Sequence, residues 1–185
     1  HVHLEDARDR GFLEVNVMGT FRVNRALFPL VKARGGRFVN ISSETGWQTA
    51  MPFNGPYAMS KHAIEAYSDA LRREMAMLGL PVVKIQPGPF RTSMVSGMHA
   101  HFAAAADHST HFGALLRRMR RFLDREQARA HDPAVLARVV VKACEARRPR
   151  AAYSVRPEPT RRVLSWLPDG VVDRILKAAL PRSAR

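Results

Sequence analysis

The stretch Tyr57-Ala58-Met59-Ser60-Lys61 is the most informative part of this sequence for its fold and chemistry. It follows a short apolar stretch that ends in Ser42 and Ser43. A tyrosine and a lysine four residues apart lie on one face of a helix. An ammonium group beside a phenol favours the phenolate, so Tyr57 could pass a proton near neutral pH. A serine hydroxyl nearby could hold a substrate oxygen. The pattern indicates alcohol/carbonyl interconversion, with hydride moving to or from a cofactor.

Taken alone, the pair has a second interpretation. Tyr57 could be a half-buried aromatic and Lys61 a solvated charge on an ordinary helix. The order of the motifs favours the chemical interpretation. The serine pair comes first, Tyr-x-x-x-Lys second, and a strand leading into Pro87-Gly88-Pro89-Phe90-Arg91-Thr92 third.

The flanking segments predict an α/β fold with a parallel sheet. Apolar spacing predicts a strand at Arg37–Ser42, covered on both faces, and further strands at Pro81–Gln86 and Ala151–Val155. Helices are predicted at Glu5–Lys32, from Tyr57 to about Leu78 with Gly79 as C-cap, and from Asp132-Pro133 to about Ala146. In open α/β sheets, ligands bind beyond the carboxyl ends of the strands, where Ser42 and Ser43 stand.

From about Leu4 to Val155 these motifs resemble the C-terminal part of a short-chain dehydrogenase/reductase. The resemblance implies a Rossmann-like doubly wound parallel sheet, of which three strands with flanking helices are present. It further implies a substrate lid at about 93–130 and an NAD(P)-dependent oxidoreductase. Residues 1–155 would form this partial domain, and residues 156–185 a C-terminal amphipathic extension.

The resemblance also assigns roles to single residues. Asn16, in Glu14–Thr20, would support the proton relay, Ser43 would hold the substrate oxygen, and Tyr57 would donate or accept the proton. Lys61 would lower the pKa of Tyr57 and bind the nicotinamide ribose. The spacing from Ser43 to Tyr57 is one residue longer than the family's commonest spacing, which leaves Ser42 as a rival. Cofactor contacts, to NAD or NADP alike, are expected at Tyr57, Lys61, Pro87, Gly88, Phe90 and Thr92.

The family's Gly-rich phosphate-binding turn does not occur in this sequence. We expect the chain to lack roughly the first 90 to 110 residues of such a fold, about half of a doubly wound sheet. The sheet would then expose an unpaired edge, and the chain alone would be inactive. The alternative function is therefore a truncated, non-catalytic fragment, or a basic protein that binds a membrane or nucleic-acid surface.

The expected lid is rich in Met, His and Ala. Met94 and Met98 are candidates for an apolar substrate pocket, although such residues are as often ordinary core. A lipophilic substrate, such as a steroid, retinoid or acyl compound, would suit that pocket. The histidines of the lid lack the Cys or carboxylate partners of a metal site, so no metal is expected.

Composition limits the remaining possibilities. The chain has 185 residues, 46% of them hydrophobic, which is typical of a globular protein. Its net charge of +14 suggests an anionic partner, yet no nucleic-acid-binding module accompanies it, so nucleic acid is not expected. The single cysteine, Cys144, lies in an apolar stretch and is predicted to be buried. A cytoplasmic location is expected.

Residues 158–180 alternate apolar and basic side chains as an amphipathic helix does. Such a helix could contact an anionic membrane from outside, or it could pack on the lid or on another subunit. The helix that begins at Tyr57 has a wide apolar face. In the family, this helix pairs with a second subunit, so a homodimer or homotetramer is implied.

Overall fold

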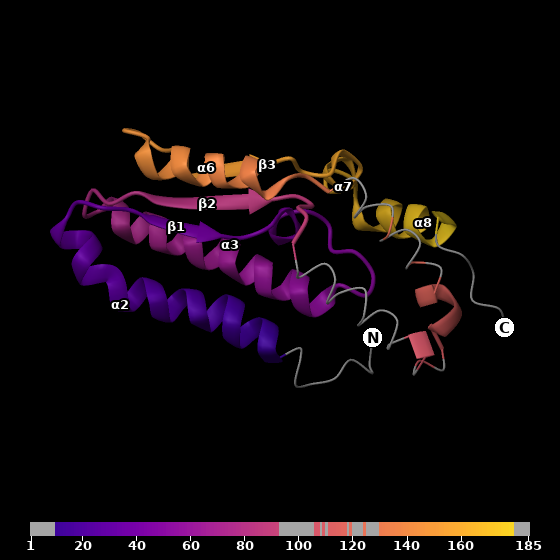
Figure 1. Ribbon diagram of the computed structural model, residues 1–185. Helices are drawn as coiled ribbons and strands as arrows, with labels where there is room; N and C mark the ends of the chain where they lie inside the picture. Colours follow the sequence, from indigo (N-terminus) through magenta and orange to yellow (C-terminus); the bar gives the residue numbers. More distant parts are fainter. Residues whose placement is uncertain are drawn as a thin grey trace.

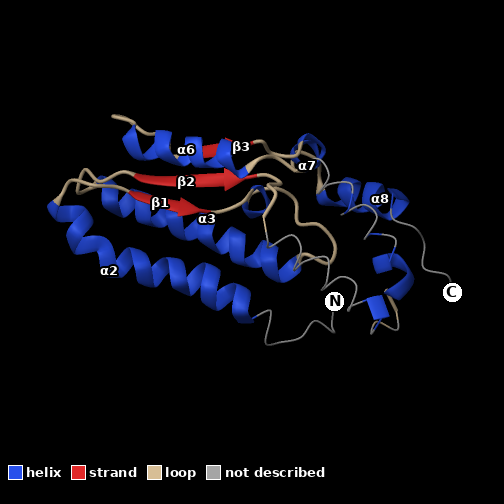
Figure 2. Ribbon diagram, in the orientation of Figure 1, coloured by secondary structure: helices blue, strands red, loops and turns tan. Residues whose placement is uncertain are grey.

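The structure is a computed structural model that describes residues 10–92, 106–107, 109, 111–117, 119, 124 and 130–179. Three parallel strands form one sheet in the order β1-β2-β3. They are β1 (Phe38–Ile41), β2 (Val82–Pro87) and β3 (Ala152–Val155). Helices α2 and α3 cover one face of the sheet and α6 covers the other (Figures 1 and 2). The predicted α/β fold with a parallel sheet is confirmed.

The predicted helices are present, with one unexpected feature. Helix α2 spans Thr20–Ala33, α3 spans Gly55–Ala76 and α6 spans Pro133–Glu145. Before α2, residues Phe12–Gly19 form a π-helix, η1, where the sequence predicted ordinary α-helix. Such segments are rare and often lie at functional sites.

Helix ends follow the predicted local chemistry. The Asp132 side chain accepts a hydrogen bond from the Ala134 amide and caps α6. Gly79, just after α3, has a φ of +69°, which glycine adopts at little cost. These ends fix where each helix returns the chain to the sheet.

The two faces of β2 differ in chemistry. Val83 and Ile85 are fully buried and pack with Phe90, Ala143 and Val155 on the α6 face. On the opposite face, Lys84 and Gln86 are also buried, but they bind polar side chains of α3. A second apolar cluster lies at the start of the strands, formed by Phe38, Met75, Leu80 and Val82.

The strand prediction for Arg37–Ser42 was wrong in one respect. Ile41 was expected to be covered, but it is 45% exposed. Within the described residues, β1 pairs only with β2 and forms an edge of the sheet. An edge strand lacks the neighbours that would cover its end.

The C-terminal segment forms two helices where one amphipathic helix was predicted. They are α7 (Pro159–Leu164) and α8 (Asp169–Ala179). Pro168 separates them, because proline has no amide proton and disfavours helical geometry in the residue before it. None of the helices among the described residues is long and apolar enough to cross a membrane.

Cys144 is exposed, so the prediction of a buried thiol was wrong. The buried stripe of α6 runs through Leu136, Val139 and Val140 to Ala143. Ala143 continues this helical spacing and is buried against the sheet. Cys144, the next residue, lies on the solvent side of the helix.

Candidate active site

Ser42 and Ser43 lie at the carboxyl end of β1, as predicted, and both are buried. The Ser43 Oγ accepts a hydrogen bond from the Thr45 amide at 3.2 Å. This bond caps the short 3-10 helix η2 (Glu44–Gly46). The chain therefore turns sharply just after the strand and holds the Ser43 hydroxyl in place.

Tyr57 and Lys61 lie one turn apart near the start of α3. Lys61 Nζ is 5.7 Å from the centroid of the Tyr57 ring. It donates to the Ile41 carbonyl at 3.3 Å, which ties it to the end of β1. Phe12 of η1 packs edge-on against the Tyr57 ring, with 5.8 Å between centroids. The fold thus brings the lysine, the tyrosine and the end of the serine strand together.

The surroundings of Tyr57 shift its pKa in opposing directions. Burial raises the pKa, hydrogen bonding with Ser43 lowers it, the Glu44 charge raises it and the Arg161 charge lowers it. The net direction is upward. Burial lowers the pKa of Lys61. A net lowering of the Tyr57 pKa was expected, with Lys61 as its cause; in this structure the lowering comes from Ser43 and Arg161, and burial outweighs it.

Ser43 and Ser42 occupy different surroundings. Ser43 lies near enough to Tyr57 for hydrogen bonding to lower the pKa of the phenol. The Ser42 Oγ lies 3.5 Å from the Lys61 carbonyl oxygen. A Cβ on Gly46 would lie 2.7 Å from each of those two Ser42 and Lys61 oxygens, so only glycine fits there. These contacts favour Ser43 over Ser42 as the partner of the phenol.

Asn16 lies within the π-helix and faces α3. Its Nδ2 donates to the Ser60 Oγ at 3.2 Å, and Ser60 in turn donates to the Tyr57 carbonyl at 2.8 Å. The Asn16 carbonyl accepts from the Thr20 hydroxyl at 2.6 Å. Asn16 thus connects η1 to the first turn of α3. The sequence did not single out Ser60, because a serine within a helix carries no distinctive pattern.

Apart from Tyr57 and Lys61, the predicted cofactor residues lie at or just after the carboxyl end of β2. A Cβ on Gly88 would lie 2.0 Å from the Arg156 carbonyl oxygen, so this position must be glycine. Thr92 is exposed. Phe90 is 5% exposed and packs in the core on the α6 face. Any contribution of Phe90 to a cofactor site therefore comes from its backbone.

Three residues that the sequence did not predict lie beside this site. Arg161 of α7 donates to Glu44 Oε1 and to Thr45 Oγ1, both at 3.2 Å. These contacts join residues 116 and 117 positions apart. The one available signal was Glu44, the acidic residue directly after the serine pair. A carboxylate that is buried at this place needs a cation as its partner.

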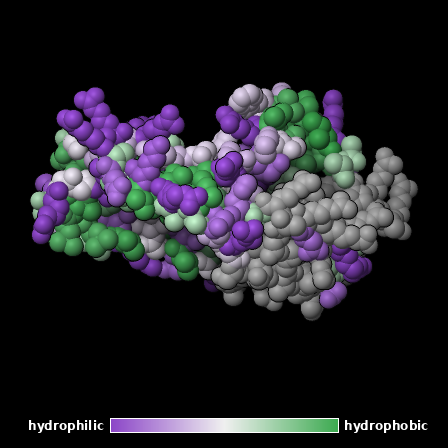
Figure 3. All heavy atoms as spheres, turned by 45° about the horizontal axis from the view of Figure 1, so that its top comes forward, coloured by the Kyte–Doolittle hydropathy of each residue, from purple (hydrophilic) through white to green (hydrophobic). Residues whose placement is uncertain are grey.

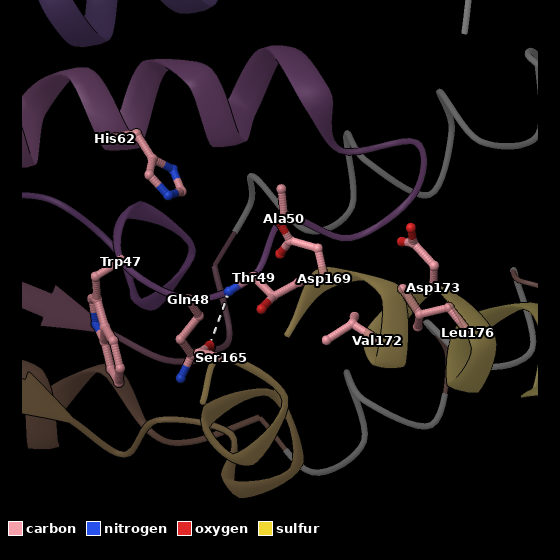
Figure 4. A pocket seen from close by; sticks show the side chains of 10 residues that line it. All are labelled: Trp47, Gln48, Thr49, Ala50, His62, Ser165, Asp169, Val172, Asp173 and Leu176. Carbon is pink, nitrogen blue, oxygen red and sulfur yellow. Dashed lines mark hydrogen bonds between the residues drawn. The ribbon is translucent and has the colours of Figure 1, made fainter. Parts of the chain in front are cut away.

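A cavity of about 410 Å³ lies between the loop after η2 and helix α8 (Figure 4). Its lining includes Trp47, Gln48, His62, Asp169 and Asp173. Ser43, Tyr57 and Lys61 do not line it. The cavity is therefore beside the candidate active site and not part of it.

Other predicted residues lie outside the described part of the chain. Met94 and Met98, the expected substrate contacts, belong to this group, as does most of the lid at 93–130. Among the described residues, no group of His, Cys, Asp or Glu has the arrangement of a metal site.

Comparison with known proteins gives the chain its family. Residues 2–101 match the sequence model of the short chain dehydrogenase family. Human retinol dehydrogenase 5 is 35% identical over 187 residues, which cover 94% of this chain and 58% of that protein. The NADPH-dependent 3-dehydrocapnine reductase of Ornithobacterium rhinotracheale is 31% identical over 95% of this chain and 62% of its own length. The chain thus spans about 60% of the length of these relatives.

Solved structures agree at the level of the fold. A short-chain dehydrogenase from Streptomyces avermitilis superposes with a TM-score of 0.67 at 23% identity, over 94% of this chain and 61% of that one. One from Burkholderia cenocepacia, solved with NADP, gives 0.62 at 20% identity, over 97% and 61%. The superpositions show the fold, and the family model, which matches more than half of the chain, shows that the chain belongs to the short chain dehydrogenase family.

Proposed function

We propose that the full-length protein is an NAD(P)-dependent oxidoreductase that interconverts an alcohol and a ketone or aldehyde. The observation that carries this proposal is the convergence of Ser43, Tyr57 and Lys61 at the carboxyl edge of a parallel sheet. Membership of the family supports it. These side chains provide what the reaction needs from a protein, an oriented oxygen partner and a proton carrier.

Each residue has a distinct proposed task. Ser43 holds the substrate oxygen, and Tyr57 gives its proton to that oxygen during reduction or takes it during oxidation. Lys61 contacts both the Tyr57 ring and the Ile41 carbonyl, which fixes the charge beside the proton carrier. Asn16 holds the first turn of α3 through Ser60. Because the Tyr57 pKa is raised, the phenol is protonated at neutral pH, which favours reduction there and oxidation at higher pH.

The nicotinamide cofactor, when bound, supplies or accepts the hydride. Tyr57, Lys61, Pro87, Gly88, Thr92 and the backbone at Phe90 would border it. The fit rests on the close approach at Gly88 and on the location of these residues beyond the ends of β1 and β2, where α/β sheets bind ligands. Either NAD or NADP is compatible with them.

The proposed substrate is lipophilic, of the steroid, retinoid or acyl kind. Retinol dehydrogenase 5 carries such a substrate class in its name and is 35% identical to this chain. Met94 and Met98 are the proposed apolar contacts. A panel of retinol, hydroxysteroid and short polar alcohols would test the class, with preference for the polar alcohols contradicting it.

The proposal is tested by replacing Tyr57 with Phe in the full-length protein. We expect turnover to fall by roughly 10²-fold or more, since general acid–base catalysis contributes that much, while cofactor binding persists. Tyr67→Phe is the matched control, because Tyr67 lies on the same helix and its hydroxyl accepts a long bond from Asn24 at 3.4 Å. Near-normal turnover of Tyr57→Phe would exclude the assigned mechanism.

A homodimer or homotetramer is proposed as the assembled state. Several apolar side chains of η1 and α2 are exposed, among them Val15 at 72%, Val23 at 56% and Leu30 at 65%. Exposed apolar surface of this kind is typical of a protein interface. A monomeric mass in light scattering at micromolar concentration would contradict it.

A second candidate function is peripheral contact with an anionic membrane by a protein that otherwise resides in the cytoplasm. Val163 and Trp166 are 58% and 76% exposed, and the Arg162 guanidinium lies over the Trp166 ring. Figure 3 shows hydrophobic side chains gathered toward the end of the molecule that carries α7 and α8. Binding to anionic vesicles with steep salt dependence would support it, and equal binding to neutral vesicles would contradict the electrostatic part.

The competing possibility is that these 185 residues act as a non-catalytic fragment, with surface binding as their function. Titration of this chain with NADH and NADPH separates the two. Binding would support a working oxidoreductase site in these residues, whereas no binding would support the non-catalytic interpretation for the chain by itself.

A further inference from the structure

A network of buried polar contacts joins the C-terminal helix α7 to the turn that carries Ser43. The Glu44 carboxylate is at its centre. Its Oε2 accepts from the Glu158 amide at 2.6 Å, and its Oε1 accepts from Arg161 Nη1 at 3.2 Å. Arg161 Nη2 reaches Thr45 Oγ1 at 3.2 Å. The start of α7 thus binds both oxygens of one carboxylate and the next side chain along the turn.

The Arg161–Glu44 pair is enclosed. The Arg161 side chain is 16% exposed and that of Glu44 is 7% exposed. Breaking such a pair by removing one partner leaves an uncompensated charge and is strongly destabilising. Glu158 also caps α7 by accepting from the Arg161 amide at 2.7 Å, which fixes where the guanidinium enters the site.

The turn that Arg161 contacts is also confined from the other side. Gly46 packs so closely on α3 that a Cβ would lie 2.7 Å from the Lys61 carbonyl oxygen. The turn Ser43–Gly46 therefore lies between α3, which carries Tyr57 and Lys61, and α7, which carries Arg161. Any displacement of α7 would move Thr45, whose amide binds the Ser43 hydroxyl at 3.2 Å.

We propose that Arg161 is a positioning residue for the reaction: through Glu44 and Thr45, it holds the Ser43 hydroxyl in register with Tyr57. This inference rests on the proposed oxidoreductase function. It gives residues 156–185 a task in the reaction, because the active-site turn is complete only with α7 in place. Arg161 acts through other residues and touches neither substrate nor cofactor in this assignment.

The two charges also act on Tyr57 in opposite senses. After burial and the Ser43 hydrogen bond, the Glu44 charge raises the pKa of Tyr57 and the Arg161 charge lowers it. With both present, their effects offset each other. Removal of Arg161 alone should therefore raise the pH at which Tyr57 ionises, and removal of the Glu44 charge alone should lower it.

The test uses Arg161→Met, Arg161→Lys and Glu44→Gln in the full-length protein. Arg162→Met is the matched control, since it removes the same charge from the adjacent, exposed position over Trp166. Two quantities are measured: the pH profile of kcat for alcohol oxidation, and the tyrosinate absorbance titration with the Tyr57→Phe trace subtracted.

For Arg161→Met, we expect kcat to fall about tenfold or more through lost positioning. We expect the Tyr57 midpoint to rise, because a cation that favours the phenolate has been removed. Glu44→Gln should move the midpoint down. Arg161→Lys should keep the wild-type midpoint of Tyr57, because the positive charge remains. Its kcat should lie between that of Arg161→Met and that of the wild type, because lysine lacks the planar guanidinium that contacts Glu44 and Thr45 together. Arg162→Met should match the wild type.

An Arg161→Met variant that matches Arg162→Met in both measurements would overturn the inference while leaving the proposed function intact. If the wild type shows no turnover with either nicotinamide, the proposed function fails, and the tyrosinate titration still decides whether Arg161 and Glu44 act on Tyr57. If Arg161→Met does not fold, the other two variants decide the question, because Arg161→Lys should keep the wild-type Tyr57 midpoint and Glu44→Gln should lower it. Equal midpoints in these two variants would overturn the inference.

Discussion

The two faces of β2 hold their helices by different physical means. On the α6 face, Val83 and Ile85 are fully buried among apolar side chains. On the α3 face, Val82 packs in an apolar cluster with Met75 at the start of the strand, and farther along the Lys84 ammonium contacts Glu65 at 2.8 Å and Asp69 at 2.9 Å. Apolar burial is non-directional, whereas charged hydrogen bonds require a set geometry. The face with the stricter geometry is the one that positions Tyr57 and Lys61.

The polar network extends across the whole sheet. Gln86 donates to both oxygens of Glu65 at 3.0 Å and accepts from the Ser154 hydroxyl at 2.8 Å. On β1, Asn40 donates to Ser68 at 2.9 Å. All three strands therefore contribute polar contacts on the face that α3 covers. Glu65, which takes part in these contacts, lies on α3 one helical turn beyond Lys61.

Replacing Lys84 with Met should have the largest effect on stability. It leaves the buried Glu65 carboxylate without its cation, at a cost of roughly 3 to 5 kcal/mol. Urea unfolding would measure the loss, with the exposed Lys142→Met on α6 as control. A Lys84→Met protein as stable as this control would remove the distinction between the two faces.

A conservative change on the apolar face should cost less. Ile85→Val removes one buried methylene and should lower the free energy of unfolding by about 1 kcal/mol. The same urea experiment measures it. A loss as large as that of Lys84→Met would mean that the apolar face is as strictly determined as the polar one.

Acid should weaken the polar face before the apolar one. Burial by itself would raise the pKa of Asp69, but the Lys84 hydrogen bond and the charges of Lys84, Arg72 and Arg73 hold it below its usual value. Its stabilisation is therefore present above the unfolded pKa of about 3.9 and is lost as pH falls through the lowered value. Asp69→Asn should flatten the fall in stability measured from pH 5 to pH 2, and an unchanged slope would contradict this role.

The smallest effect is expected at Cys144 on α6. The thiol is exposed and outside the apolar cluster, so Cys144→Ser should change the free energy of unfolding by less than about 0.5 kcal/mol. Thermal unfolding and thiol labelling of the native protein would check this. A thiol that reacts only after unfolding would place Cys144 in the core, as the sequence first suggested.

The sequence could predict features that depend on near neighbours. The Asp132 cap, the Gly79 turn and the three strands each follow from local patterns, and the structure confirms them. It could not predict contacts between distant segments. The bond from Arg161 to Glu44 joins residues 117 apart. The position of Glu44 after the serine pair could signal the need for a cation, but the sequence around it does not identify Arg161 as that cation.

Periodicity also has limited precision. It predicted a helix through Phe12–Gly19 but not its π-helical form, since apolar spacing over eight residues does not distinguish the two. It placed Cys144 in a buried stripe that in fact passes through Ala143, because a register error of one residue is enough to move a side chain to the solvent.

The central claim is that the polar face of the sheet sets the position of α3 and so of Tyr57 and Lys61. The most direct measurement compares kcat, per folded molecule, of Glu65→Gln/Lys84→Met with that of Ile85→Val in the full-length protein. The double variant removes the charges of Lys84 and Glu65 and keeps an acceptor for Gln86, while Asp69 retains its ion pair with Arg72. We predict that it loses about tenfold in kcat while Ile85→Val retains the wild-type value; equal kcat values in the two variants would contradict the claim.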